Sequence, residues 1–540
     1  MTETTETPTK ETKPKTKAAK PVYRTYEDYD FDTLQTYGGL DVIATSEILS
    51  HLMPKMMHRP GLLEDDGQGN RKPIVGEAPL HSYLNIIQPC LDFVIDLEIR
   101  GMAYDVVRNR QIHARMVEEI NELEDKIFTS IGKRINLDSG VEVAGFLYEE
   151  KGFTAPFQTK GGGDATDGAA LMTLAELDPT GYRYTTEKPE LQFLADMAKR
   201  RDINSVHNTF IKNYIKDFVK SDGRIHPSYN LHGTSGFRIS GDRPNLLQLP
   251  RAKHGYNVRE CYTVGEGNVF VTWDFSSAEV KVMAALCRDE NMVKACRDNL
   301  NFHAYSASLM HGIPYDEFME VLEDSSHSLQ KTYKQHRQIA KILTFSILYG
   351  STAGGIAFQL SIPKEEAERL IAMYFSAYPG MRSFIERIQN RARWNQKVWT
   401  PFWQTKHEYA TKPVFQKTAS FNAALRNASN IIVQSPTSTM GLLCFAELDK
   451  AVVKCDAFSM ANVYDSSEVE SPYDRVAEVV ELGFKYMNDW PVETFDWLDF
   501  PIGVECEIGW NWGQVEQVHR GVTQGECEAI LERLKLEKTW

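Results

Sequence analysis

The sequence predicts an α+β protein of several subdomains, because helix-type and strand-type patterns occupy separate stretches of a long chain. Its 540 residues exceed one ordinary domain and predict roughly three or four domains or subdomains. Helical patterns dominate up to about residue 220, strands and loops follow over 224–272, and helices rich in Lys and Arg occupy 286–427. The stretch 428–540 mixes helix and strand.

The first half of the chain is expected to hold long helices that end near glycine or proline. Residues 1–22 are rich in Thr, Lys, Glu and Pro, and we expect them to be disordered. Asp222-Gly223 is a turn signal before the first strands. Apolar spacing predicts helices over 26–53, about 80–100, about 109–127 and 190 to about 220.

Charge is distributed unevenly along the chain. The net charge is −14, which alone argues mildly against a nucleic-acid partner. Residues 325–426, however, carry fifteen Lys and Arg against five Asp and Glu, a local net of +10 that leaves −24 for the remainder. A basic block in an acidic chain is typical of a groove that follows phosphates. A solvated positive face is the alternative.

The cysteines and the apolar runs exclude several classes of protein. None of the eight cysteines lies in a C-x-x-C pair or at a zinc-ligand spacing, so we expect reduced, mostly buried thiols. No apolar run approaches the ~18 residues of a membrane span. The N-terminus lacks an apolar signal core.

The first candidate site residue is Asp274, which ends an apolar run that begins at Val269. A carboxylate at a strand end can bind a metal ion without being buried unpaired. The alternative is a capping role for the next helix, together with Ser276 and Ser277.

A second candidate, Asp465, stands between an apolar helix over 440–453 and an acidic stretch. The segment Val463-Tyr464-Asp465-Ser466 could form a strand or a hairpin turn, and by itself it favours a turn.

A third segment carries a stripe of two cations and two aromatic side chains. No Gly or Pro occurs between Tyr315 and Tyr349, and one residue of the stripe recurs every fourth position. At about 100° per residue such positions drift by only ~40° per step and share one helix face. The stripe suits a ligand with phosphates at one end and a flat base at the other. An amphipathic helix with snorkelling basic chains is the alternative. Its members are Arg337, Lys341, Phe345 and Tyr349.

In their order along the chain, with the segment of Asp465 last, the three segments resemble the three polymerase motifs of the DNA polymerase I family (family A). The resemblance extends over about residues 80–540. The other segments similar to that family are Leu97–Gly101, Gly223–Ser228, Thr234–Ser240 with Pro244–Leu246, Asn301–His303, Arg426-x3-Asn430-x3-Gln434 and Glu505–Trp512.

The resemblance implies a right-hand polymerase with a thumb, a palm with an antiparallel sheet, and helical fingers. It implies that the chain adds dNMPs to the 3′ end of a primer on a DNA template, by two-metal phosphoryl transfer. The ranges it implies are 76–223 for thumb and entry helices, 224–285 for the first part of the palm, 286–427 for the fingers and 428–540 for the second part of the palm.

The resemblance also implies a role for each matching residue. Two Mg²⁺ ions, with Mn²⁺ as an alternative, would bridge Asp274 and Asp465, and the carbonyl of Phe275 would be a further ligand. Lys341 would be a general acid for the leaving group. Substrate dNTP would be bound by Arg337, Lys341 and His303 at the triphosphate, by Phe345 and Tyr349 at the base, and by Glu279 at the 2′ position. DNA would be contacted by Arg238, Asn245, Arg426, Asn430, Gln434 and Tyr464.

Two departures from the family pattern limit these expectations. The third motif usually reads His-Asp-Glu, and here it is Tyr464-Asp465-Ser466. The essential aspartate is kept, but a degenerate protein that binds primer–template without catalysis stays an alternative. Lys281 stands where Arg is usual, which we regard as minor.

The second departure concerns the family's 3′–5′ exonuclease. Tyr37-x3-Asp41 fits the last signature of that domain, so residues 23–75 are interpreted as its remnant. Asp96-x-Glu98 mimics the first signature but lies inside a polymerase-entry helix, so we reject it. A separate exonuclease chain that completes a site at Asp41 is the alternative, and a processivity factor is another candidate partner. No 5′-nuclease domain is expected.

This architecture suggests a phage or plasmid-like replicator that works in the host cytoplasm, with no membrane partner. A single-subunit RNA polymerase relative is a competing interpretation. Glu279 and the loop of Arg238 argue against it.

Overall fold

The computed structural model describes most of the chain from residue 83 onward. It describes 83–536 except 160, 179–182, 232, 235, 237, 253–254, 396–397, 403–404 and 407–418, together with 47–48, 50, 63–65 and 71–73. The predicted disordered tail and the Tyr37-x3-Asp41 pattern lie outside these residues. So does the predicted helix over 26–53, apart from Glu47, Ile48 and Ser50, which are helical.

The chain forms two compact units, Met1–Leu80 and His81–Trp540. In the first unit the described strands β1 (Leu63–Asp65) and β2 (Arg71–Pro73) pair antiparallel. Every polymerase site residue that the sequence predicts falls in the second unit.

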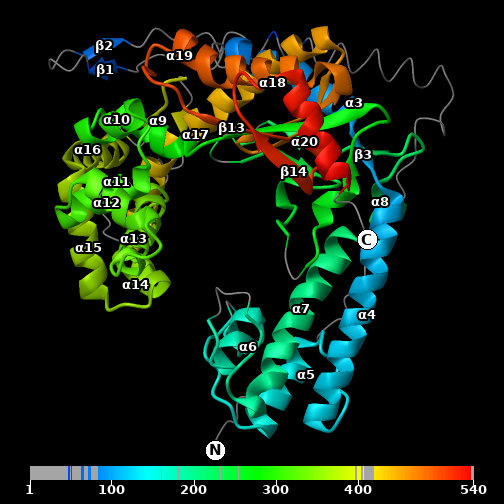
Figure 1. Ribbon diagram of the computed structural model, residues 1–540. Coiled ribbons are helices and arrows are strands. Elements are labelled where there is room, and N and C mark those ends of the chain that lie inside the picture. The colour runs from blue at the N-terminus through cyan, green and yellow to red at the C-terminus, as the bar shows by residue number, and fades with distance from the viewer. Residues whose placement is uncertain are drawn as a thin grey trace, which may run out of the picture. The chain divides into compact units, whose positions relative to one another are not determined.

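A central antiparallel sheet of eight strands organises the second unit (Figure 1). Its strand order is β11-β12-β8-β13-β7-β3-β4, and β14 pairs with β13 at the side. The sheet therefore joins strands from both ends of the unit. The strands are β3 (Met102–Tyr104), β4 (Arg224–Ile225), β7 (Tyr262–Thr263), β8 (Asn268–Phe275), β11 (Phe458–Val463), β12 (Ser466–Pro472), β13 (Val504–Asn511) and β14 (Gln514–Val518).

The period-2 alternation of β8 explains its central place. Val269, Val271 and Trp273 point into one hydrophobic core, which includes buried residues of α9 (Ala278–Cys287), α17 (Ala419–Val452) and α18 (Val476–Phe484). Trp273 lies against Gly483 of α18, where a Cβ would come within 2.0 Å of the indole. On the other face, Phe270 belongs to a second core and Asp274 is exposed. Both faces of β8 thus pack into cores, and the second face also carries Asp274 near the end of the strand.

The helices before the sheet begin and end largely where the sequence predicts. Helix α3 (Gln88–Arg100) stops at Gly101. Helix α4 (Val106–Ile131) begins at Asp105, whose side chain accepts from Arg108 N at 2.8 Å, and ends at the left-handed Gly132. The connection to α7 contains α5 (Gly140–Ala144) and α6 (Gly168–Leu174).

The prediction of one continuous helix over 190 to about 220 is wrong. The structure has α7 (Gln192–Phe210) and a separate short α8 (Tyr214–Phe218). At the break Ile211 leaves helical geometry, with φ −125°. This turn buries Tyr214 in the second core, where the Tyr262 hydroxyl donates to the Tyr214 hydroxyl at 2.6 Å. Tertiary burial therefore overrides a segment that contains no Gly or Pro.

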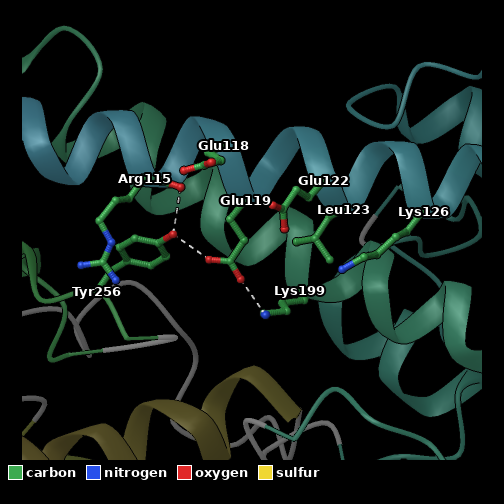
Figure 2. A pocket seen from close by; sticks show the side chains of 8 residues that line it. All are labelled: Arg115, Glu118, Glu119, Glu122, Leu123, Lys126, Lys199 and Tyr256. Carbon is green, nitrogen blue, oxygen red and sulfur yellow. Dashed lines mark hydrogen bonds and ion pairs between the residues drawn. The ribbon is translucent and has the colours of Figure 1, made fainter.

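Helices α4 and α7 run side by side, and α4 contacts the segment that leads into β7 (Figures 1 and 2). Glu119 of α4 forms an ion pair with Lys199 of α7 at 2.6 Å and accepts a hydrogen bond from the Tyr256 hydroxyl at 2.6 Å. The guanidinium of Arg115 lies 5.6 Å from the centre of the Tyr256 ring. These contacts frame a polar hollow of about 330 Å³.

A bundle of helices follows β8 and α9 in the chain (Figure 1). Helices α11, α12 and α13 share a separate small core around Phe318 and Tyr333. The helices of this bundle are α10 (Glu290–Arg297), α11 (Phe302–His311), α12 (Tyr315–Glu323), α13 (Gln330–Leu348), α14 (Ala353–Leu360), α15 (Lys364–Ala377) and α16 (Pro379–Asn395).

Helix α17 continues through Pro436 and across the predicted boundary between fingers and palm at 427 and 428. By length and mean hydropathy (1.2) the stretch Asn422–Cys455 could cross a membrane, but 78% of the tested window is buried inside the protein, as in a core helix. All eight cysteines are free and buried, as predicted.

Short strands and helices complete the described unit. Strands β5 (Ser228–Asn230) and β6 (Ser240–Asp242) pair with each other, as do β9 (Val398–Trp399) and β10 (Thr405–Lys406). The last helices are α19 (Trp490–Thr494) and α20 (Gln524–Leu536).

Candidate active site

Asp274 and Asp465 come together although 190 residues lie between them in the sequence. Asp274 is the penultimate residue of β8, and Asp465 lies in the two-residue turn between β11 and β12. Strand β12 places Ser466 directly opposite Asp274. The backbone N–H of Phe275 donates to the carbonyl of Asp465 at 3.1 Å. The hairpin prediction for Asp465 is confirmed, and the helix-capping alternative for Asp274 is not, since no side chain caps α9.

Burial and neighbouring carboxylates disfavour ionisation of both aspartates. Burial raises the pKa of Asp465 to about 6; Arg238 opposes this shift, while Glu279 and Asp274 add to it. Desolvation by the surrounding protein and then Glu505 raise the pKa of Asp274, although its side chain reaches solvent. Such raised pKa values are typical of carboxylates gathered for function.

The donor set suits a hard divalent cation. Neither Asp274 nor Asp465 has a side-chain hydrogen-bond or ion-pair partner within the described part of the chain. Oxygen ligands are the ones Mg²⁺ prefers, and a cation would relieve the repulsion between the two carboxylates. Among the described residues no three His, Cys, Asp or Glu side chains form a metal cluster by themselves. A site here therefore needs oxygens from the backbone, the substrate or water.

Sequence reasoning missed several charged neighbours of Asp274. Register places Glu505 opposite Asp274, and Glu507 opposite Thr272, both on β13. Burial is the largest cause of the raised pKa of Glu507, and Glu505 adds to it. The guanidinium groups of Arg251 and Arg259 lower this pKa by a smaller amount. The family resemblance marked the segment of β13, but only the strand register shows that its glutamates flank Asp274.

The predicted stripe is confirmed as one face of α13. The ring centres of Phe345 and Tyr349 are 6.2 Å apart, and His303 of α11 lies 5.6 Å from Phe345. The Nε of Arg337 donates to the Oδ1 of Asn301 at 3.3 Å. The same Asn301 oxygen caps α11 by accepting from Ala304 N, so one side chain fixes the start of α11 against the stripe.

A cleft of about 270 Å³ opens between this stripe and the sheet. Its lining includes His303 and Arg337 together with Ser276, Ser277 and Glu505. Lys281, which stands where the family usually has Arg, also lines the cleft and donates a hydrogen bond to the carbonyl of Ile502. The N-terminus of α9 opens here as well, and helix N-termini favour phosphate.

His303 is neutral at pH 7 in this arrangement. Burial lowers its pKa to about 4, with smaller contributions from Arg337 and Lys341. Its Nδ1 is buried and has no partner among the described residues. A negatively charged group in the cleft would stabilise the protonated form of His303 and would be a hydrogen-bond partner for its Nδ1.

Glu279 connects three predicted residues. It forms an ion pair with Arg238, whose guanidinium lies 5.8 Å from the centre of the Tyr464 ring. Tyr349 lies beside the same pair, and burial followed by Glu279 raises the pKa of Tyr349 to about 12. Glu279 itself is buried. This network stands next to Asp465 and ties α9, α13 and the β11–β12 turn together.

The predicted DNA-contacting residues are only partly brought together. Gln434 on α17 lies against Gly236, two residues before Arg238, since a Cβ on Gly236 would lie 2.6 Å from its Oε1. Arg426 abuts Gly350, and Asn430 is half-buried one turn farther along α17. Asn245, by contrast, turns back onto its own chain and accepts from Leu247 N at 3.0 Å.

A family model described as DNA polymerase family A matches residues 107–514. The chain belongs to this family. A thermostable DNA polymerase I of Thermus thermophilus is 28% identical over 439 residues, which cover 81% of this chain and 49% of that protein. DNA polymerase I of Chloroflexus aurantiacus is 25% identical, covering 84% of this chain and 45% of that protein.

A solved polymerase-domain structure confirms the predicted fold. The POL domain of Pol1 from M. smegmatis, in complex with DNA primer–template and dNTP, matches with a TM-score of 0.68 and 25% identity. The match covers 80% of this chain and 71% of that chain. The α+β right-hand polymerase fold is thus confirmed, while the chain spans about half the length of the curated relatives it matches.

One buried acid gives a pH-dependent prediction for this family A chain. Burial raises the pKa of Glu468 on β12 to about 8, so the folded state keeps a proton that the unfolded chain releases. Its stabilising contribution is full below the ordinary glutamate pKa and is lost as pH rises through about 8. We expect the Tm of the wild type to fall relative to that of Glu468→Gln between about pH 5 and about pH 9. Thermal melts of both proteins without metal test this, and parallel curves would contradict it.

Proposed function

We propose that this chain is a template-directed DNA polymerase that adds dNMPs to a primer 3′ end. The observation that carries the proposal is the meeting of Asp274 and Asp465, neither with a side-chain partner among the described residues, beside a cleft lined by Lys281 and Arg337. Membership of family A and the likeness to a polymerase domain with bound primer–template and dNTP support it.

In this proposal Asp274, Asp465 and the carbonyl of Phe275 hold two divalent cations, Mg²⁺ or Mn²⁺. These ions would supply a lowered pKa at the primer 3′-hydroxyl and charge neutralisation at the pyrophosphate. The backbone hydrogen bond from the N–H of Phe275 to the carbonyl of Asp465 keeps β8 and the β11–β12 turn in register for this role.

The cleft beside α13 would take the triphosphate. Arg337 lines the cleft and Lys341 lies one turn farther along α13, so both would supply positive charge. The Nδ1 of His303, which has no partner among the described residues, would supply a hydrogen-bonding group. Lys341 is exposed on the stripe and would protonate the leaving pyrophosphate. Phe345 and Tyr349 continue the same face toward Glu279, which puts the base and the sugar at the far end from the phosphates.

Primer–template would lie along the residues that gather around Arg238. Arg238 and Gln434 would read minor-groove acceptors that correct base pairs share. Arg426 and Asn430 of α17 and Tyr464 of the turn would extend this contact, while Asn245 would act by shaping the loop.

We assign the subdomains by the same resemblance. Residues 76–223 form the thumb and entry helices, 224–285 and 428–540 the palm, and 286–427 the fingers. The exonuclease remnant over 23–75, a partner exonuclease or processivity factor, the phage or plasmid-like setting and the cytoplasmic location stay predictions.

Extension of a labelled primer on a DNA template, with dNTPs and Mg²⁺, tests the proposed function. Extension that depends on the template and on dNTPs is the expected result. Binding of primer–template without extension would identify a non-catalytic binding protein. Preferred incorporation of rNTPs would identify a relative of the single-subunit RNA polymerases.

The residue at 345 is expected to set the use of dideoxynucleotides. In the family that this sequence resembles, Phe here goes with poor use of dideoxynucleotides and Tyr with good use. Phe345→Tyr is therefore expected to raise termination by ddNTPs at a fixed ddNTP to dNTP ratio. Sequencing-type ladders of wild type and variant measure this, with Tyr349→Phe as a control for hydroxyl placement on the same helix face. Unchanged termination would mean that α13 is misassigned.

A further inference from the structure

Two buried glutamates on β12 have the same place in the fold and different surroundings. Glu468 and Glu470 are both buried and occupy the same face of the strand. Glu470 is fully partnered, since it accepts from Gly265 N, from Asn268 Nδ2 and from Arg224 at 2.7–2.8 Å. Glu468 has one partner, the hydroxyl of Ser466 at 2.6 Å, and its Oε2 has none among the described residues. Burying a carboxyl group this way is unfavourable, so Glu468 needs a reason beyond packing.

Ser466 connects Glu468 to the turn that carries Asp465. Its hydroxyl lies 3.1 Å from the carbonyl of Val463, the residue before the turn, as well as 2.6 Å from Glu468. A hydroxyl has one proton to donate and can also accept. With a proton on Glu468, the carboxyl donates to Ser466 and Ser466 donates to Val463, so both bonds form together.

The turn itself needs support. Tyr464 has φ +57°, a left-handed conformation that costs a side-chain-bearing residue about 1 kcal/mol or more. Asn462 closes the turn from the other side, where its Nδ2 donates to the carbonyl of Ser466 at 2.6 Å. Ser466 therefore bonds across the turn with its side chain and its backbone, and Asp465 sits between these two attachments.

We propose that Ser466 and Glu468 form one positioning unit that orients Asp465 for a divalent cation. The unit fills strand positions 466 and 468, directly opposite Asp274 and Thr272 on the same sheet face. It explains how a hydroxyl can occupy the position after the catalytic aspartate. The inference rests on the proposed function, since it assigns these residues a role in the same site.

Binding of Mn²⁺ to the complex of the full chain with primer–template, followed by electron paramagnetic resonance, tests the unit, together with single-nucleotide insertion. Partners that orient a metal ligand are worth about 10- to 100-fold in metal affinity. We expect Ser466→Ala and Glu468→Leu each to weaken Mn²⁺ affinity and slow insertion by about that factor. The Mn²⁺ affinity of the double variant should be no lower than that of the weaker-binding single variant, because both substitutions break the same chain of hydrogen bonds.

Two further variants separate orientation from packing. Glu468→Gln keeps the volume and the hydrogen bond to Ser466, so its Mn²⁺ affinity should stay near that of the wild type. Glu470→Gln changes an equally buried acid on the same face and should lower the Tm without changing Mn²⁺ affinity. If Glu468→Leu does not fold, Ser466→Ala alone decides.

Wild-type Mn²⁺ affinity in Ser466→Ala would overturn the proposal, as would additive losses in the double variant or an equal loss in Glu470→Gln. Failure of the proposed function looks different. In that case the wild type itself would not extend a primer, and Asp465→Asn would bind Mn²⁺ as the wild type does.

Discussion

Asp465→Asn is expected to slow nucleotide insertion by about a thousandfold or more, because metal ions contribute several kcal/mol of charge stabilisation and each ~1.36 kcal/mol is tenfold in rate. The asparagine keeps the volume and one oxygen but loses the charge that binds a cation. The turn should survive, because its attachments use the backbone carbonyl of Asp465 and the side chains of Asn462 and Ser466. Primer–template affinity should therefore change little.

Rapid-quench insertion of one dNMP under single-turnover conditions measures this rate, and a fluorescence titration of the same primer–template measures affinity. Asp274→Asn should give a loss of similar size. Asp499→Asn is the matched control, since that aspartate pairs with Arg288 and Arg297 on the surface. Rates within tenfold of the wild type in both site variants would remove the two aspartates from the chemistry.

Local patterns account for what the sequence predicted well. The stripe from Arg337 to Tyr349 needs only the helix period, and a long stretch without Gly or Pro supports it. Asp274 at the end of an apolar run and Asp465 in a turn follow from short-range patterning too. Their meeting did not follow from patterning, because no local signal states that β8 and β12 are neighbours. It came from resemblance to a family.

Strand register accounts for what the sequence could not predict. Glu505 faces Asp274 only because β13 pairs with β8 in one register, and a shift of one residue would turn it to the other face. Glu468 looks like any acid in the acidic stretch after Asp465. Its burial is a property of the folded sheet, and its contrast with Glu470 depends on the partners of Glu470, which lie some 200 residues or more away in the sequence: Arg224, Gly265 and Asn268.

Glu279→Ala is expected to weaken discrimination against rNTPs by roughly 10- to 200-fold, the range that small steric differences in an enzyme pocket support. In the proposed site Glu279 crowds the 2′ position, and it is a buried residue of α9 beside Tyr349. Alanine opens room for a ribose hydroxyl. It also releases Arg238 from its ion pair and removes the acid beside Tyr349, so lost volume and lost charge must be separated.

Three variants make that separation. Glu279→Gln keeps the volume and can still accept from Arg238, so it should retain discrimination if crowding is the cause. Arg238→Ala removes the ion pair while leaving Glu279 in place, so it should weaken primer–template binding with little change in sugar selection. Ratios of kcat/KM for dNTP and rNTP insertion opposite one template base measure both effects. If Glu279→Gln loses discrimination as fully as Glu279→Ala, charge rather than volume selects the sugar; if neither does, Glu279 serves only to hold Arg238, and the sugar is selected elsewhere in the site.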